Sequence, residues 1–173
     1  MRRMERKAQM AQQVQETVKV AVERNITIYT DGSCLGNGTA NARGGWAAIL
    51  SCEELNYSKE LSGAVPGTTN NRMELTAVVE GLKAIKGQHN VTVYSDSAYV
   101  VNAVQNGWID KWQKNCWINS QRKPVENRDL WEAFISLSDE KCASIKMVHV
   151  RGHADNGMNN RCDALAVAAA NTL

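Results

Sequence analysis

The sequence lacks any long apolar run. Its 173 residues contain no stretch that approaches the roughly 20 apolar residues a membrane-spanning helix needs. Hydrophobic residues make up 43% and charged residues 22%, which is ordinary for a soluble globular protein. The chain also shows no internal repeat, and its length suits one domain with a sizeable core rather than two. We therefore expect a single soluble domain with no membrane partner.

Paired cysteine motifs are also absent. The five cysteines are odd in number, scattered, and never spaced C-x-x-C, which argues against a disulfide framework or a zinc site. The N-terminus has no apolar signal segment, and its glutamates and lack of serine are unlike a mitochondrial presequence. These features favour a reducing cytoplasmic location.

A strong overall charge is missing too, since the net charge is only +2. Residues 1–24 hold six basic and three acidic side chains, and the remainder holds 14 basic and 15 acidic ones. Any affinity for nucleic acid must therefore come from local patches. We interpret residues 1–24 as a basic N-terminal extension, helical or disordered, and residues 25–173 as the domain.

Three segments near the start of the domain have the pattern of strands. Asn25–Asp31 alternates and is rich in β-branched residues, and Gly44–Leu50 and Asn56–Gly63 follow after turn-length polar segments. Strands joined by such short connections predict an antiparallel meander.

The pattern then changes to an alternation of helices and strands. A helical period begins at Asn71, and a helix over Ser97–Gly107 follows the predicted strand Asn90–Asp96. A last strand, Ser144–Val150, precedes an alanine-rich helix over Cys162–Leu173. A meander followed by β-α-β predicts an α/β fold with a five-stranded mixed sheet flanked by helices.

Four carboxylates occupy notable places in this pattern. Asp31 and Asp96 end two predicted strands, and Glu74 and Asp163 fall in the first turns of two predicted helices. Each alone would be an ordinary turn or helix-end residue. Together they would repel one another unless cations neutralise them, and oxygen ligands suit Mg²⁺ or Mn²⁺. Two divalent ions would balance four acids, which is the charge balance of two-metal phosphodiester hydrolysis.

Six motifs, in order, give the sequence a family resemblance. They are "YTDGSCLGN", "GGWAAIL", "TTNNRMEL", "VYSDSAYV", "KPVENRDLW" and "RGHADNGMNNRCDALA". From about Ile26 to Asn171 the chain closely resembles type-1 ribonuclease H, which cuts the RNA strand of RNA–DNA hybrids. The resemblance implies a ribonuclease H-like fold with a protruding helical handle.

The resemblance also implies the chemistry of the site. Asp31, Glu74, Asp96 and Asp163 match the catalytic acids that hold two Mg²⁺ ions, for which Mn²⁺ can substitute, with Asp31 shared between the ions. Cleavage would be endonucleolytic and would leave 3′-hydroxyl and 5′-phosphate ends. His153, in "RGHAD", would be an ordinary polar loop residue on its own. It matches a catalytic histidine that acts in proton transfer or product departure.

Around "TTNNRMEL" the resemblance implies contacts with the hybrid. Asn70 and Asn71 could simply cap a helix, but they match amides that read the minor groove. Thr69 and Arg72 match a pocket for a phosphate of the DNA strand, beside a helix N-terminus.

Three further residues match positions close to the RNA strand. Cys34 and Asn37, together with Asn71, match positions that sense the 2′-hydroxyl, the group that separates RNA from DNA. Asn159 matches a residue that helps to position the RNA strand near the metal ions.

The segment 107–131 corresponds to the handle and carries four of the five tryptophans. Trp108 matches a residue that packs against DNA sugars, whereas Trp112, Trp117 and Trp131 are expected in the core. Residues 107–128 hold five basic and two acidic side chains, so the handle is only moderately positive. We hypothesise that the basic residues between Arg2 and Lys7 supplement its grip on the hybrid.

Two rival functions fit part of this pattern. A hybrid-binding module without cleavage would not need all four acids and the histidine. A DNA-cutting relative, such as a resolvase or transposase core, would share the carboxylates but not "TTNNRMEL" and the handle. We expect a monomer with no obligate protein partner, because no large apolar surface stripe is evident.

Overall fold

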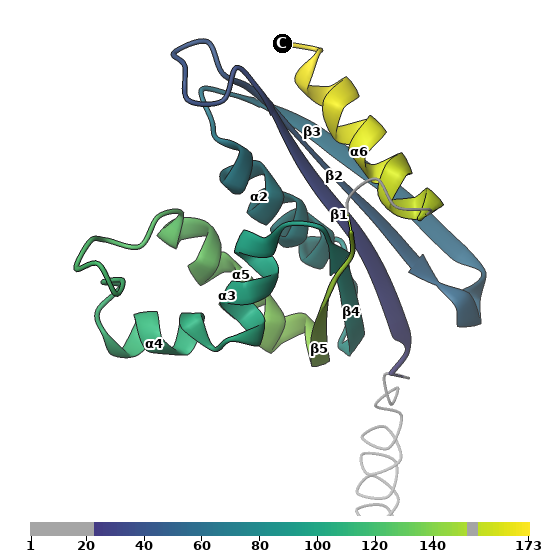
Figure 1. The fold of residues 1–173 in the computed structure, drawn as a ribbon. Coiled ribbons are helices and arrows are strands. Elements are labelled where there is room, and N and C mark those ends of the chain that lie inside the picture. The colour runs from purple at the N-terminus through teal and green to yellow at the C-terminus, as the bar shows by residue number, and fades with distance from the viewer. Residues whose placement is uncertain (1–22, 152–155) are drawn as a thin grey trace, which may run out of the picture.

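The computed structural model describes residues 23–151 and 156–173, which fold as a central sheet flanked by helices (Figure 1). The strands are β1 (Asn25–Leu35), β2 (Arg43–Cys52), β3 (Tyr57–Pro66), β4 (His89–Ser95) and β5 (Cys142–His149). The helices are η1 (Glu53–Leu55), α2 (Asn70–Lys83), α3 (Ala98–Gln105), α4 (Trp108–Lys114), α5 (Arg128–Lys141) and α6 (Gly157–Ala170). Among these described elements, no helix is both long and apolar enough to cross a membrane.

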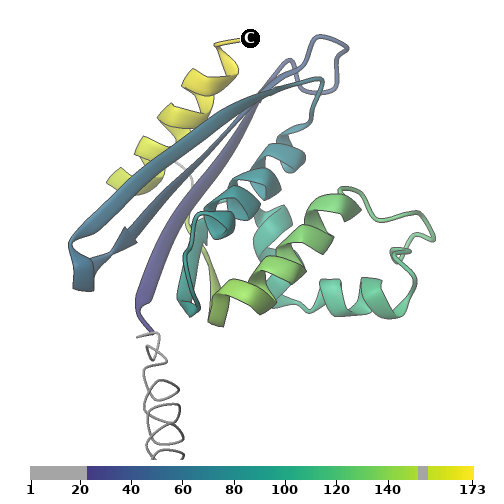
Figure 2. The same ribbon diagram turned by 180° about the vertical axis from the view of Figure 1, so that it is seen from behind.

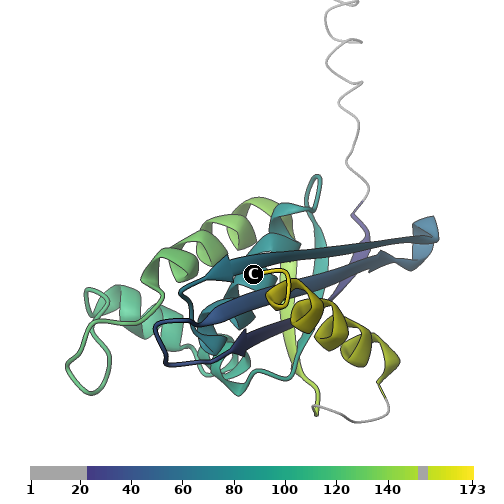
Figure 3. The same cartoon turned by 90° about the horizontal axis from the view of Figure 1, so that it is seen from above.

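The five strands form one mixed sheet in the order β3-β2-β1-β4-β5. β2 pairs antiparallel with both β1 and β3, while β4 pairs parallel with β1 and β5. The predicted meander followed by β-α-β is therefore confirmed. Helices α2, α3 and α5 lie on one side of the sheet, and α6 is the helix of the described residues that covers the other (Figures 2 and 3).

Apolar side chains fill both sides of the sheet. The larger cluster joins β1, β2 and β4 to α2, α3 and α5, with Ile28, Leu75 and Val93 fully buried. The smaller cluster lies under α6 and is built from small residues such as Ala47 and Ala166. A Cβ on Gly45 would overlap the backbone of Ala166, so glycine there permits the close approach of α6.

The first strand is longer than the sequence predicts. β1 does not end at Asp31 but continues to Leu35, because its antiparallel pairing with β2 runs on to the pair Leu35–Arg43. Its parallel pairing with β4, in contrast, stops at the pair Tyr29–Tyr94. Asp31 therefore lies inside a strand, just beyond the point where the neighbouring strand ends.

Two helices also begin earlier than expected. Thr69 caps α2 by accepting a hydrogen bond from the Arg72 N–H at 3.3 Å, so Glu74 is the fifth helical residue and lies beyond the first turn. Asn156 caps α6 by accepting from two backbone N–H groups, so Asp163 is its seventh residue. Gly157–Asn160, predicted as loop, form the first turn because this cap satisfies their backbone.

The handle consists of α4, the irregular segment 115–127 and the start of α5, and it extends away from the sheet (Figure 1). Trp131 and Trp117 are buried in the main core, as predicted, and Trp112 is partly buried and packs against this core. The ring centroids of Trp112 and Trp131 are 5.6 Å apart. Aromatic packing therefore anchors the handle to the main core of the domain.

Candidate active site

Three of the four predicted acids meet at one edge of the sheet. One carboxyl oxygen from each of Asp31, Glu74 and Asp96 lies within 4.8 Å of the other two. Asp31 comes from β1 and Asp96 directly follows β4, and these strands are parallel neighbours, so both residues reach the same edge. Glu74 lies on α2, which packs against β1.

The close approach of α2 depends on Gly32. A Cβ on Gly32 would overlap the backbone of both Met73 and Glu74. Glycine beside Asp31 therefore lets the helix lie directly against the strand and brings Glu74 to Asp31. Asp31 and Glu74 are each only 5% exposed.

Burial and repulsion make this cluster costly without a cation. Burial raises the pKa of Asp31 to about 7, with the charges of Asp96 and Asp163 adding to the shift, while the Gly32 N–H donates to its Oδ1 at 2.7 Å. Burial, and then the charges of Asp31 and Asp96, raise the pKa of Glu74 well above its usual value. Glu74 Oε2 is buried and has no hydrogen-bond partner. An unpartnered carboxylate oxygen among other carboxylates fits a hard divalent cation.

Asp163 is placed beside this group but not within it. It lies half-buried on α6, and its charge contributes to the raised pKa of Asp31. It does not join the set of mutually close oxygens found among the described residues. His153 lies outside the described residues, so its predicted role stays a prediction.

The comparisons with known proteins decide the family. The model of the RNase H family matches residues 23–171. The chain belongs to the RNase H family. A ribonuclease H of Thermoanaerobacter sp. (strain X514) is 52% identical over 141 residues, which cover 82% of this chain and 86% of that protein. This RNase H is accordingly an endoribonuclease, a hydrolase.

Solved structures support the same fold. LC9-RNase H1, a type 1 RNase H with the type 2 active-site motif, superposes with a TM-score of 0.74 at 26% identity, covering 87% of this chain and 74% of that one. LC11-RNase H1 in complex with RNA/DNA hybrid superposes with a TM-score of 0.63 at 22% identity, covering 85% of this chain and 97% of that one. The ribonuclease H-like fold predicted from the sequence is thus confirmed.

Around the N-terminus of α2, predicted substrate residues contact one another. The Asn70 backbone N–H donates to Asn37 Oδ1 at 3.1 Å, which ties the loop after β1 to the start of α2. The Asn70 side chain donates to Glu74 Oε1 at 3.5 Å, so it lies against a member of the acid cluster. Thr69, and neither Asn70 nor Asn71, is the residue whose side chain caps the helix.

Three other predicted substrate residues differ in their accessibility. Asn71 is exposed, and Cys34 is half-buried with its thiol donating to the Thr68 carbonyl at 3.5 Å. Asn159, in contrast, is 2% exposed, and its Oδ1 has no hydrogen-bond partner. Its side chain therefore belongs to the interior of the site rather than to an open surface.

The handle presents an aromatic and basic surface. Trp108 is 36% exposed and its ring centroid lies 6.3 Å from that of Trp112. Both tryptophans line a cavity of about 520 Å³, together with Lys111. All five basic side chains of the handle are exposed: Lys111, Lys114, Arg122, Lys123 and Arg128.

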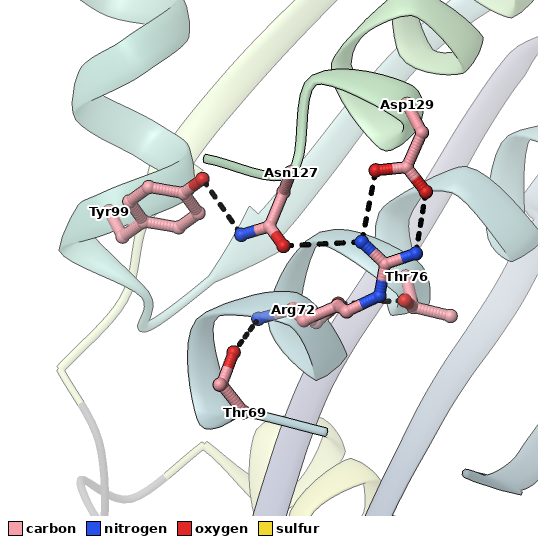
Figure 4. A network of polar contacts seen from close by, with 6 residues as sticks. All are labelled: Thr69, Arg72, Thr76, Tyr99, Asn127 and Asp129. Atoms are coloured by element: carbon pink, nitrogen blue, oxygen red, sulfur yellow. Dashed lines mark hydrogen bonds and ion pairs between the residues drawn. The ribbon is translucent and has the colours of Figure 1, made fainter. Parts of the chain in front are cut away.

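One polar network was not foreseen from the sequence (Figure 4). Arg72 donates from Nη1 to Asp129 Oδ1 at 3.0 Å and from Nη2 to Asp129 Oδ2 at 2.5 Å, and also from Nη1 to Asn127 Oδ1 at 3.2 Å. Asn127 in turn donates to the Tyr99 hydroxyl at 3.2 Å. The motif "VENRDLW" contains Asn127 and Asp129, but spacing alone could not show that they face Arg72.

Proposed function

We propose that this RNase H cleaves the RNA strand of RNA–DNA hybrids at internal phosphodiester bonds with two Mg²⁺ ions, for which Mn²⁺ can substitute. The products would carry 3′-hydroxyl and 5′-phosphate ends. The observation that carries this proposal is the group of three carboxyl oxygens within 4.8 Å, with a buried, unpartnered oxygen on Glu74. Membership of the RNase H family supports the substrate, and a hybrid is bound in the related LC11-RNase H1 structure.

Asp31, Glu74, Asp96 and Asp163 would hold the ions, with Asp31 as the shared ligand. When bound, such ions supply an activated water molecule and positive charge for the leaving 3′-oxygen. The chain itself orients the ligands. The Gly32 N–H fixes one oxygen of Asp31, and the Asn70 amide lies against Oε1 of Glu74, which leaves Oε2 for a cation.

Contacts with the DNA strand and the minor groove would come from the start of α2 and from the handle. We propose that the Thr69 hydroxyl, whose oxygen accepts from the Arg72 N–H, keeps its proton free to donate to a DNA phosphate at the start of α2. Asn70 and Asn71 would read the minor groove. Trp108 would pack against DNA sugars from the exposed face of α4.

On the RNA side, Cys34 and Asn37 would sense the 2′-hydroxyl together with Asn71. Asn159 would help to position the RNA strand near the metal ions. His153, outside the described residues, would accept or deliver a proton, or assist product departure, because histidine titrates near neutral pH. Its substitution by alanine is expected to slow cleavage at saturating hybrid. An unchanged rate would remove His153 from the mechanism.

One cleavage assay separates this function from its rivals. Labelled RNA–DNA hybrid, double-stranded DNA and double-stranded RNA are incubated with the protein in Mg²⁺ or in EDTA, and the ends of any products are identified. We expect Mg²⁺-dependent cutting of the RNA strand of the hybrid alone. Hybrid binding without cutting would support a binding module, and cut DNA would support a DNA nuclease.

A further inference from the structure

We propose that Arg72 is a positioning residue that fastens the handle to the catalytic helix α2, and not a ligand of the substrate phosphate. This inference rests on the proposed function, because it takes the handle to be a hybrid-binding element. Arg72 belongs to α2, whereas its partners Asn127 and Asp129 stand at the start of α5, where the handle returns to the body (Figures 1 and 4).

The guanidinium of Arg72 already makes hydrogen bonds to protein oxygens. Its two terminal nitrogens bind the two oxygens of Asp129 as a fork, and Nη1 also reaches Asn127. The hydrogen bonds and charge of Arg72 hold the pKa of Asp129 below its usual value, so the carboxylate stays ionised. A phosphate at Arg72 would have to compete with this carboxylate for the same N–H groups. Bidentate pairing therefore directs Arg72 toward the protein and away from the substrate.

Asn127 uses its side chain for this contact rather than for capping α5. Asn127 precedes the first residue of α5 in a left-handed conformation with φ of 56°, yet its side chain makes no capping bond to its own helix. Asparagine at this position ordinarily caps. Here its oxygen instead accepts from Arg72 and its amide donates to the Tyr99 hydroxyl. A local contact is given up for one that spans three helices.

Tyr99 completes the connection. Its hydroxyl accepts from Asn127 and also from the Trp131 indole N–H at 3.0 Å. Tyr99 lies at the start of α3, soon after Asp96, and Arg72 lies two residues before Glu74. The network thus joins the handle to both helices that flank the acid cluster. It fixes the distance between the handle's grip on the hybrid and the site of cleavage.

The test compares variants of both partners in the full chain. Arg72→Ala and Asp129→Ala are each expected to raise KM for hybrid about three- to tenfold, with kcat within about twofold. Because neither residue binds phosphate, the salt dependence of hybrid binding, measured in EDTA, should keep its slope. The exchange Arg72→Asp with Asp129→Arg should restore most of the affinity. Arg72→Lys keeps the charge but loses the fork, and should behave like Arg72→Ala.

Glu60→Ala is the matched control, because it removes a similar two-bond pair with Arg161 between β3 and α6, far from the handle. Its KM should stay at the wild-type value. The proposal fails if Arg72→Ala lowers the salt slope while Asp129→Ala tightens binding, which is the result for a phosphate ligand. It fails equally if Asp129→Ala leaves KM unchanged. Absence of cleavage by the wild-type protein would instead count against the proposed function, since binding in EDTA does not depend on cleavage.

Discussion

Asp31 and Glu74 present carboxyl oxygens within 4.8 Å of each other, although both residues are only 5% exposed and come from a strand and a helix. Two acids in this arrangement resist simultaneous ionisation. The protein therefore keeps a destabilising group of charges at its sheet edge, and this has measurable consequences for stability, metal binding and catalysis.

Substitution of Asp31 by asparagine should stabilise the metal-free protein at pH 8 while abolishing cleavage. The pKa of Asp31 rises from 3.8 to about 7 on folding. The folded state therefore holds the proton more tightly, and the stability that protonation contributes is present below pH 4 and lost as the pH rises through about 7. We expect a gain of about 2 to 4 kcal/mol at pH 8 and little gain at pH 4.

Denaturant unfolding in EDTA at both pH values measures this difference. Asp139→Asn, at an exposed position of α5, is the control and should change stability little at either pH. Equal stability of Asp31→Asn and wild type at pH 8 would show that the charge of Asp31 does not destabilise the folded protein.

Mg²⁺ should relieve the same repulsion. Adding Mg²⁺ at pH 8 is expected to raise the thermal unfolding temperature of the wild-type protein in a concentration-dependent way, because the ion binds only the folded cluster. Glu74→Gln, which removes the charge of a carboxylate whose Oε2 has no hydrogen-bond partner, should show a much smaller rise. Identical shifts in both proteins would place the ion elsewhere.

The contact between β1 and α2 gives a third prediction. Gly32→Ala would drive a methyl group into the backbone of Met73 and Glu74, so α2 would have to move away from the strand. We expect a loss of about 1 to 3 kcal/mol of stability and at least about a tenfold loss of kcat, since Glu74 moves with the helix. Gly157→Ala, where an added Cβ meets nothing within 4 Å, is the control. Wild-type kcat in Gly32→Ala would mean that the contact between β1 and α2 accommodates a methyl group without displacing Glu74.

Much of this site could be predicted from the sequence, because the type and order of the elements follow from hydrophobic period. The four acids could be selected by charge balance as well as by resemblance. What failed were features that depend on contacts distant in sequence. "DGSCL" has the composition of a loop, yet it remains a strand because β2 continues to pair with it. Likewise, the first turn of α6 was hidden by its polar residues, and the pairing of Arg72 with Asp129 could not be predicted because the two residues lie 57 positions apart.

The basic N-terminal extension provides the last prediction. The handle offers five basic groups against two acidic ones, and Arg128 is already paired with Glu132. If residues 2–7 bind phosphates, deleting residues 1–24 should weaken hybrid binding and lower the magnitude of its salt slope by about one unit for each phosphate that the protein no longer neutralises. The fold should survive, because β1 begins at Asn25 and the deletion removes only the first two residues of the family match, which begins at residue 23. Circular dichroism checks this, and binding titrations from low to high salt measure the slope. An unchanged slope would leave hybrid binding to the handle and α2 alone.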